Sequence, residues 1–160
     1  MSIKKLFQNG VTYVLIQAGL LGILFLGPTD WWGILSLSQI VSEILKMIAL
    51  ILFPLGVLIA IVAAIQLKRN LTPLPMPVEH GELIQTGLYA YVRHPIYLGV
   101  ILMALAWFLH TQAVLTLVEF IAVMIFFEVK SRQEEYWMGQ VYPEYAEYQR
   151  RTAKLVPRVY

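Results

Sequence analysis

Cysteine is absent from the sequence, so neither disulfide bonds nor thiolate chemistry take part in its fold or function. Charged residues are also scarce, at 14% of the 160 residues against about 25% in a typical soluble domain. Because the charges leave long apolar runs uninterrupted, we expect a lipid bilayer as the solvent. The length allows one integral-membrane domain over residues 1–160.

The motifs by which soluble proteins hold nucleotides and metals are missing too. The sequence has no Gly-x-Gly-x-x-Gly, P-loop or Gly-x-Ser-x-Gly motif. Its histidines, His80, His94 and His110, are far apart and fit no metal-binding spacing, so we expect no metal. The basic residues form no stripe with aromatic residues, which argues against nucleic-acid binding despite a pI near 8.9.

Four apolar segments are present, and we predict that each crosses the membrane as a helix. They run from about Val11 to Leu26, Ile44 to Leu67, Ile96 to Leu109 and Ala113 to Phe127. Roughly 20 residues are needed to cross the hydrocarbon, and the last two segments are shorter than that. Only His110-Thr111-Gln112 separates those two, which predicts a short helical hairpin. Gly19, Gly22 and Gly27 are compatible with close helix approach, although small residues are ordinary in membrane helices.

Basic residues sort onto one side of this four-helix arrangement. Eleven of the twelve Lys and Arg residues precede the first helix, lie between the second and third, or follow the fourth. The exception, Lys46, follows Glu43 by three residues and can pair with it at the outer rim. By the positive-inside rule, both termini and the middle connection are cytoplasmic. We expect no cleaved signal segment and a location in the inner (plasma) membrane of a prokaryote.

Two cytoplasmic segments are predicted to cap these helices. Alternating prolines at Pro73, Pro75 and Pro77 favour an extended surface chain between the second and third helices. Beyond Phe127 the pattern predicts a helical extension and then a second, amphipathic helix. Tyrosines recur there at intervals of three residues: Tyr142, Tyr145 and Tyr148.

A polar cluster opens the third apolar segment: Arg93-His94-Pro95-Ile96-Tyr97-Leu98-Gly99. Charged and ring groups are costly at the mouth of a membrane helix and need partners. Pro95 suits the first turn of the helix, where its missing N–H costs nothing. Singly, Arg93, His94 and Tyr97 are explained as an anchor, a capping residue and an aromatic-belt residue. Together they indicate a site for a polar ligand.

Acidic residues near the fourth segment are ambiguous. Glu128, Arg132 and Glu135 fall on one helical face with Glu134 beside them, either as exposed ion pairs or as part of the site. Glu119 lies at bilayer depth, and its carboxyl group has either a structural or a functional role there.

The stretch from Gly87 to Gly99, Gly-Leu-Tyr-Ala-Tyr-Val-Arg-His-Pro-Ile-Tyr-Leu-Gly, resembles the signature of the integral-membrane methyltransferases. That family includes isoprenylcysteine carboxyl methyltransferase and the phospholipid N-methyltransferases. A second family signature is similar to residues of the tail: Glu134-Glu135, Trp137, Tyr145, Tyr148, Thr152, Lys154 and Pro157. The resemblance covers about Leu83 to Arg158. Val141-Tyr142 departs from the family's usual Phe-Gly or Tyr-Gly, so the choice between Glu134 and Glu135 stays open.

The resemblance implies an all-α membrane protein with four transmembrane helices, the last two a short hairpin. Residues 1–67 would form two N-terminal helices and residues 68–160 a methyltransferase-like core. The cytoplasmic loop and C-terminal helices would cap a pocket for S-adenosylmethionine. The implied cofactor-binding residues are Tyr89, His94, Pro95, Tyr97, Leu98, Glu135, Tyr145 and Tyr148, and the implied catalytic residues are Arg93, Glu128 and Glu134.

The chemistry agrees with this resemblance. Methyl transfer from a sulfonium depends mainly on positioning, and tyrosine faces and a carboxylate suit the positive charge. Arg93 suits an acceptor carboxylate or phosphate. The proton of an amine or thiol acceptor can pass to a nearby base, for which the candidates are Glu128, Glu134, Glu135 and His94.

We therefore predict S-adenosylmethionine-dependent methyl transfer to a lipidic or membrane-partitioned small acceptor at the cytoplasmic interface. An isoprenylcysteine carboxylate, a phospholipid amine and a thiol remain open as acceptors. The alternatives are an NADPH-dependent membrane reductase of the sterol type and a non-catalytic membrane scaffold or transporter subunit. Membrane lipids are the expected partners, and the oligomeric state is open.

Overall fold

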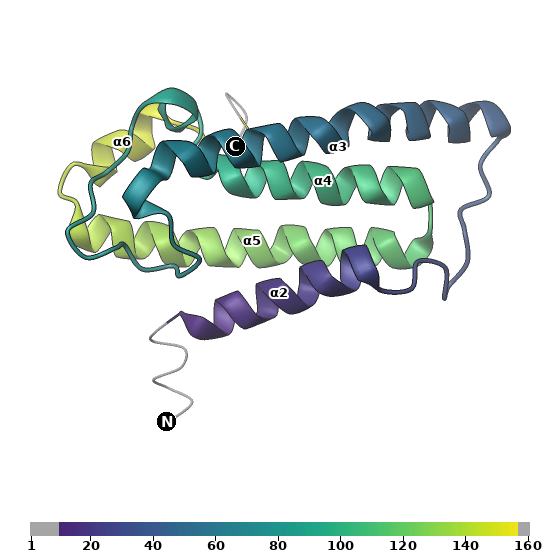
Figure 1. The fold of residues 1–160 in the computed structure, drawn as a ribbon, viewed down its shortest axis with the longest axis horizontal. Coiled ribbons are helices and arrows are strands. Elements are labelled where there is room, and N and C mark those ends of the chain that lie inside the picture. Colours follow the sequence, from purple (N-terminus) through teal and green to yellow (C-terminus); the bar gives the residue numbers. More distant parts are fainter. Residues whose placement is uncertain (1–9, 157–160) are drawn as a thin grey trace.

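A computed structural model describes residues 10–156 of the chain. Within that range the chain is helical and forms no strand, only two isolated β-bridges. The helices are α2 (Val11–Leu26), α3 (Gln39–Leu67), α4 (Pro95–Thr111), α5 (Val114–Val141) and α6 (Tyr145–Arg151), with 3₁₀ turns η1 (Lys68–Asn70) and η2 (Gly87–Ala90). Figure 1 shows α2 to α5 side by side along the long axis, with α6 and the α3–α4 connection together at one end.

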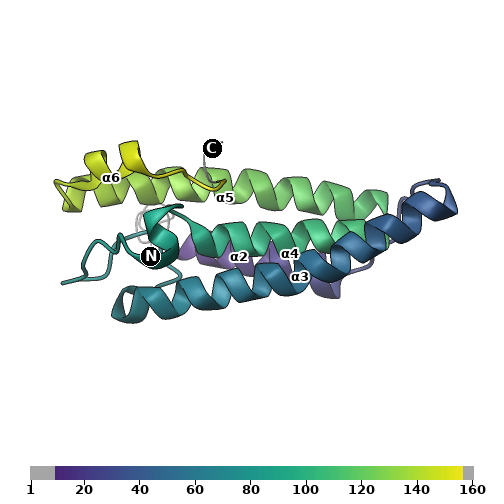
Figure 2. The ribbon, with the colours of Figure 1, turned by 90° about the horizontal axis from the view of Figure 1, so that it is seen from above.

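Helices α3 and α4 approach each other closely at two glycines. A Cβ atom on Gly56 would lie 2.6 Å from the carbonyl oxygen of Gly99, and one on Gly99 would lie 2.5 Å from that of Gly56. By contrast, a Cβ on Gly19 or Gly22 would meet no described atom within 4 Å, so close approach through these two is not observed. Figure 2 shows α4 lying between α3 and α5.

The hairpin between α4 and α5 is confirmed, but its turn is shorter than predicted. Helix α4 continues through His110 and Thr111, and the turn begins at Gln112, which has the left-handed φ of 54°. The Gln112 side chain donates to the Ser42 carbonyl at 2.9 Å and accepts from the Ser42 hydroxyl at 2.8 Å. These bonds satisfy the turn's polar groups and fasten it to α3, which is why two residues are enough.

Both predicted elements of the tail are present. Helix α5 runs 28 residues without a break, well past Phe127, and α6 follows after a short turn. The chain then returns to the start of α4, where Val92 and Ala153 form a parallel bridge. The amide N–H groups of Arg93 and His94 donate to the carbonyls of Ala153 and Lys154 at 2.9 and 3.2 Å. The C-terminal segment therefore covers the site motif.

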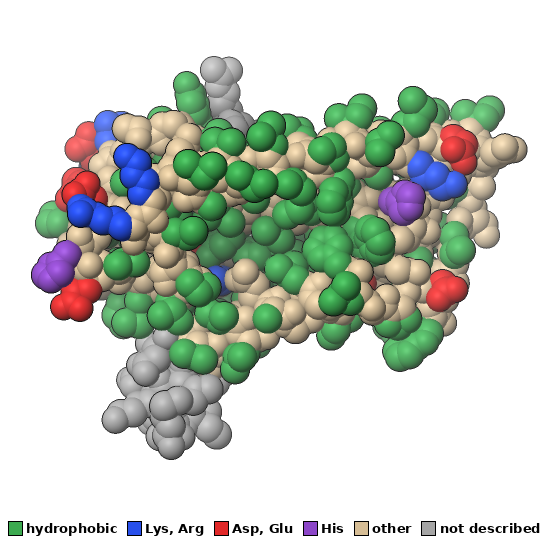
Figure 3. Space-filling view, in the orientation of Figure 1, with side chains coloured by type: hydrophobic (Ala, Val, Ile, Leu, Met, Phe, Trp, Pro, Cys, Tyr) green, Lys and Arg blue, Asp and Glu red, His purple; other side chains and the backbone are tan. Residues whose placement is uncertain are grey.

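The surface is that of a membrane protein. One helical stretch of the described chain, Gln39–Asn70, is long and apolar enough to cross a bilayer, with a mean hydropathy of 3.0. Helices α2 and α4 are apolar but have only 16 and 17 residues. Figure 3 shows apolar side chains over the flanks of the bundle and charged ones gathered at its two ends. Lys46 and Glu43 pair as predicted, at 3.1 Å.

Candidate functional site

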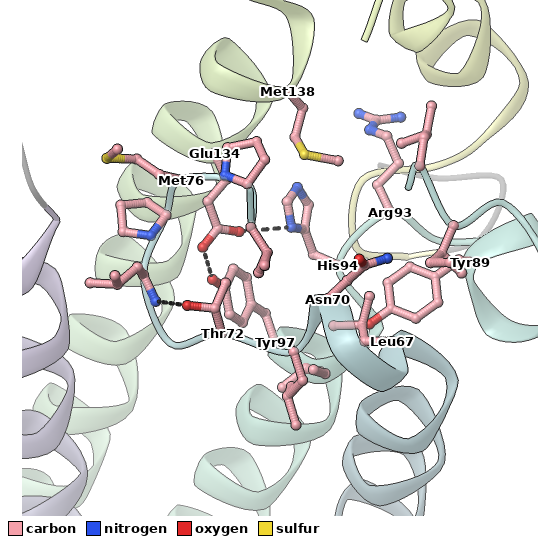
Figure 4. A pocket seen from close by; sticks show the side chains of 18 of the residues that line it. Leu67, Asn70, Thr72, Met76, Tyr89, Arg93, His94, Tyr97, Glu134 and Met138 are labelled. Carbon is pink, nitrogen blue, oxygen red and sulfur yellow. Dashed lines mark hydrogen bonds and ion pairs between the residues drawn. The ribbon is translucent and has the colours of Figure 1, made fainter. Parts of the chain in front are cut away.

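A cavity of about 390 Å³ lies at the end of the bundle where α6 meets the α3–α4 connection. Side chains from α2, α3, α4, α5, α6 and the connection line it, and Figure 4 shows it from close by. Seven predicted site residues are in the lining: Tyr89, Arg93, His94, Tyr97, Glu134, Tyr145 and Tyr148. The volume falls in the range of about 300–1,000 Å³ that small-molecule sites occupy.

Glu134 is the acid of the predicted pair that lines the cavity, and two side chains from the start of α4 hold its carboxylate. The Tyr97 hydroxyl donates to Oε1, and His94 Nδ1 lies 3.5 Å from Oε2 (Figure 4). Pro95 opens α4 directly after His94, so His94 and Tyr97 stand one helical turn apart. Their rings stack with centroids 5.4 Å apart and planes inclined by 2°.

Glu135 does not line the cavity; its carboxylate joins His94 to Arg93. Oε1 lies 3.1 Å from His94 Nε2 and accepts from Arg93 Nε at 2.7 Å. Gln149 Nε2 donates to Oε2 at 3.2 Å. Burial by itself raises the pKa of Glu135, but the hydrogen bonds and positive charges of His94 and Arg93 outweigh burial and lower it to about 2.

His94 stands between two carboxylates. Burial by itself lowers the pKa of His94, but its hydrogen bonds to Glu134 and Glu135 and their negative charges outweigh burial. The net effect raises the pKa of His94 above its ordinary value of 6.5. The charged imidazolium is therefore the form that this arrangement favours.

Arg93 holds the C-terminal segment in place. Besides its bond to Glu135, its Nη1 atom donates to the carbonyl of Gln149 at 3.1 Å and to that of Thr152. The side chain is only 11% exposed. The structure thus places Arg93 at the cavity wall, but with three contacts that fasten α6 and the chain after it.

Three tyrosines form the wall of the cavity next to α3 and α6. The Tyr148 hydroxyl donates to the carbonyl of Tyr89 at 2.7 Å, and the Tyr89 hydroxyl donates to that of Ala63 at 3.4 Å. Tyr145 meets Tyr148 edge to face, with centroids 5.8 Å apart. Burial, opposed by the charge of Arg93, raises the pKa of Tyr148 to about 12. Burial also raises the pKa of Tyr89 and of Tyr145, so all three rings stay neutral near pH 7.

Three further predicted residues lie outside the lining. The Glu128 carboxylate accepts from Arg132 Nε at 2.5 Å and from Lys154 Nζ at 2.7 Å, so it belongs to an ion-pair group beside the site. Pro95 is buried in the first turn of α4, and Leu98 is half-buried one turn further along. Glu119 also lies away from the cavity, and within residues 10–156 neither of its buried carboxylate oxygens has a hydrogen-bond partner.

Several polar side chains of the cavity were not predicted as site residues, and Lys130 and Gln17 are the two that contact each other. Lys130 Nζ donates to Gln17 Oε1 at 2.7 Å and to the Pro73 carbonyl at 3.0 Å. It also lies 5.3 Å from the centre of the Tyr97 ring. Lys130 precedes Glu134 by one helical turn, a spacing that could have indicated it. Nothing in the sequence indicates that Gln17, on α2, reaches the same place.

The fold and the cavity define a helical membrane protein with a small-molecule site at one end of its bundle. Among the described residues, no three His, Asp or Glu side chains are grouped in a way that could hold a metal ion. Residues 44–145 match the phospholipid methyltransferase family, and the chain belongs to that family. This membership confirms the resemblance to the integral-membrane methyltransferases and disfavours the reductase and scaffold alternatives.

The fold is similar to that of a solved structure, the eukaryotic intramembrane Ras methyltransferase isoprenylcysteine carboxyl methyltransferase. The TM-score is 0.62 at 17% sequence identity, over 99% of this chain and 55% of that one. The chain thus spans about half the length of that protein. No curated protein sequence matches the chain. The family match begins inside α3, earlier than the resemblance did, and ends at Tyr145.

Proposed function

We propose that the protein transfers a methyl group from S-adenosylmethionine to a lipidic acceptor in this cavity. The observation that carries the proposal is a single cavity lined by Glu134, by neutral tyrosine faces and by apolar side chains. Glu134 and the tyrosine faces suit a soluble sulfonium, and the apolar side chains suit a membrane-borne acceptor.

The lining fits S-adenosylmethionine on chemical grounds. A sulfonium is a cation, and cations bind to the faces of aromatic rings. Tyr89, Tyr145 and Tyr148 supply such rings, and Glu134 supplies a negative charge in the same space. When bound, the cofactor supplies an electrophilic methyl group, and the residues have to align it with the acceptor.

Glu134 and Glu135 have different roles in this proposal. Glu134 lines the cavity, so it faces the positive charge of the donor and can accept a proton from an amine or thiol acceptor. Glu135 acts through His94 and Arg93, and we assign it a positioning role. Glu128, which lies outside the lining, has no part in the proposal.

In the membrane, we propose that α2, α4 and the part of α5 up to Phe127 cross alongside α3. Their lengths of about 21 to 26 Å fall short of a hydrocarbon thickness of about 30 Å, which local thinning of the bilayer accommodates. The cavity then opens at the cytoplasmic face of a prokaryotic plasma membrane, because the basic residues of the tail and the α3–α4 connection gather there.

Titration calorimetry in dodecyl maltoside tests the cofactor. S-adenosylhomocysteine should bind, and NADPH should not. S-adenosylhomocysteine, the product of the reaction, lacks the sulfonium charge. Glu134→Gln should therefore weaken the binding of S-adenosylmethionine at least fivefold more than the binding of S-adenosylhomocysteine. Glu147→Gln, an exposed acid on α6, is the matched control. Binding of NADPH without binding of either sulfur ligand would contradict the proposal.

A lipid screen with a labelled methyl donor tests the acceptor. The candidates are phosphatidylethanolamine, a farnesylcysteine with a free carboxylate and an alkyl thiol. Transfer to one of them, abolished by Glu134→Gln or Tyr97→Ala but not by Glu147→Gln, is the expected result.

A further inference from the structure

Lys130 is a buried cation on the α2 side of the cavity. The residue is 1% exposed and contributes to the lining. Its ammonium group donates to two neutral acceptors, Gln17 Oε1 on α2 and the Pro73 carbonyl on the α3–α4 connection. These two bonds hold Nζ in place without neutralising its charge.

The charge of Lys130 is only partly compensated. The closest carboxylate among the described residues is Glu134, whose Oε1 atom lies 3.9 Å away and already accepts from the Tyr97 hydroxyl. An ammonium has three N–H donors, and two of them are used. Burial lowers the pKa of Lys130, and Glu134 opposes that effect. A buried cation whose counter-ion is distant and shared with another donor is costly, so an anion brought by a ligand would be stabilised there.

The charges around this end of the cavity also favour an anion. The cations are Arg93, Lys130 and His94 in its favoured charged form, while the anions are Glu134 and Glu135. Glu82 also lines the cavity, but its charge is balanced by the exposed Arg69, with which it is paired. The five other groups carry one more positive than negative charge before any ligand binds. A sulfonium donor adds a further positive charge. A neutral acceptor would leave the charge of the protein groups and that of the donor uncompensated.

The position of Lys130 assigns the anion to the acceptor. Gln17 links the ammonium to α2, where Leu15 and Ile16 are exposed on the lipid-facing surface. The tyrosine wall stands on other elements, with Tyr89 bonded to α3 and Tyr148 on α6. A membrane-borne molecule that enters along α2 meets Lys130, while a soluble cofactor that stacks on the tyrosines does not need it.

We propose that Lys130, held by Gln17, is a binding subsite for an anionic group, a phosphate or a carboxylate, on the methyl acceptor. This proposal rests on the proposed function, because it names the chemical class of its acceptor. A lysine ammonium is a point charge that binds both kinds of oxyanion through charge-assisted hydrogen bonds. Lys130 is thus a specificity-determining residue that selects acidic lipids over neutral ones.

Binding of simple amphiphiles tests this without turnover. The probes are dodecyl phosphate, dodecanoate and neutral dodecanol, titrated into the protein in dodecyl maltoside. Lys130→Met should weaken binding of one or both anions at least tenfold and leave dodecanol unchanged. Arg132→Gln removes the same charge from a side chain 72% exposed on the same helix, and it should change nothing. The anion with the larger loss distinguishes a lipid phosphate from a carboxylate acceptor.

A second variant covers the case in which Lys130→Met fails to fold. Gln17→Glu keeps the size of the side chain and places a carboxylate against Nζ, so it should weaken anion binding in the same way. Affinity for S-adenosylhomocysteine should stay within threefold of wild type in both variants.

Each other outcome has a definite meaning. Wild-type anion affinity in Lys130→Met and Gln17→Glu would overturn the subsite. An equal loss of S-adenosylhomocysteine affinity would overturn it too, because Lys130 would then hold the cofactor's carboxylate. Lys130-dependent anion binding in a wild-type protein that does not bind S-adenosylhomocysteine would support the subsite and contradict the proposed function.

Discussion

Glu134 and Glu135 are neighbours in the chain, yet their carboxylates have different surroundings. Successive residues of a helix point about 100° apart, so the two carboxylates point in different directions, and of the two only Glu134 lines the cavity. Glu134 accepts from Tyr97 there, while Glu135 accepts from Arg93 beside it. At the scale of single residues, the function therefore depends on which face of α5 meets α4.

Tyr97→Phe tests how Glu134 is held. The change removes the hydroxyl that donates to Glu134 but keeps the ring packed on His94 and Phe127. A hydrogen bond to a charged group contributes about 1.5–3 kcal/mol, so methyl transfer should fall by roughly 10- to 100-fold. The melting temperature should also fall, because the same hydrogen bond stabilises the folded state, but the protein should stay folded at the assay temperature. Tyr91→Phe, at an exposed tyrosine, should keep full activity; full activity in Tyr97→Phe as well would count against the site.

The pH dependence of stability tests the group formed by His94 and Glu135. The pKa of Glu135 is lowered from 4.5 to about 2, so its contribution is present above pH 4.5 and is lost as pH falls toward 2. The pKa of His94 is raised above 6.5, so its contribution is present below pH 6.5 and is lost as pH rises through the raised value. Between pH 4.5 and pH 6.5, both Glu135 and His94 therefore contribute fully to the stability of the folded state.

The melting temperature of the wild type should therefore be highest near pH 4.5 to 6.5. Glu135→Gln should flatten the decline on the acidic side when unfolding is followed from pH 3 to pH 8. The exposed acid Glu147 provides the control, and Glu147→Gln should keep the wild-type profile. Equal acid sensitivity in Glu135→Gln would contradict the assigned role.

At the scale of elements, the contact between α3 and α4 decides where the site motif stands. The two backbones touch at Gly56 and Gly99, and Gly99 lies one turn after Pro95 at the start of α4. Any widening of this contact would shift the His94 and Tyr97 rings relative to α5. The resemblance includes Gly99, but no pattern in the sequence pairs it with Gly56.

Gly99→Ala tests this contact. The added Cβ would lie 2.8 Å from the Ala60 amide nitrogen as well as 2.5 Å from the Gly56 carbonyl oxygen, and backbone atoms cannot give way cheaply. Overpacking of this kind costs about 1–3 kcal/mol, so the melting temperature and activity should both fall. Gly22→Ala on α2 meets nothing and should be neutral or slightly stabilising, by up to about 1 kcal/mol. Equal effects of the two changes would argue against the close contact.

Arg93→Ala tests how the C-terminal segment is held over the cavity. The loss of the bonds to Gln149 and Thr152 should leave the membrane helices folded while the chain after Val141 detaches. Limited proteolysis should then cleave within α6, and methyl transfer should be abolished. Arg151→Ala, at an exposed arginine of α6, should resist cleavage and remain active. Full activity of Arg93→Ala would refute this role.

At the scale of the whole molecule, the charged ends and apolar flanks set the orientation in the bilayer. The two ends differ, because the cavity, α6 and most basic residues gather at one of them. This asymmetry supports the proposal that the cavity opens to the cytoplasm.

The absence of cysteine makes the orientation directly testable. Asp30 is exposed in the α2–α3 connection, and Glu79 is exposed in the α3–α4 connection. The variants Asp30→Cys and Glu79→Cys each introduce a single cysteine for labelling. A membrane-impermeant maleimide should label position 30 from outside intact cells and position 79 only in inverted vesicles. The reverse pattern would place the cavity on the other side of the membrane.

Much of the fold was predictable from local patterns. The apolar run from Val11 to Leu26 matches α2 in both bounds, and Pro95 opens α4 as expected. Membrane helices are specified by continuous apolar stretches, which one sequence displays. The hairpin turn was misplaced because Gln112 is stabilised by Ser42, 70 residues away.

What the sequence by itself determined is the membrane setting, the order of the helices and the polar motif that the family match supports. These follow from hydropathy, proline position and a short run of residue types. Only the tertiary structure decided that Glu134, and not Glu128 or Glu135, lines the cavity, and that Lys130 and Gln17 join it. The physical reason is that a cavity is made by side chains from separate helices, and the rotation and crossing of those helices are set by long-range packing.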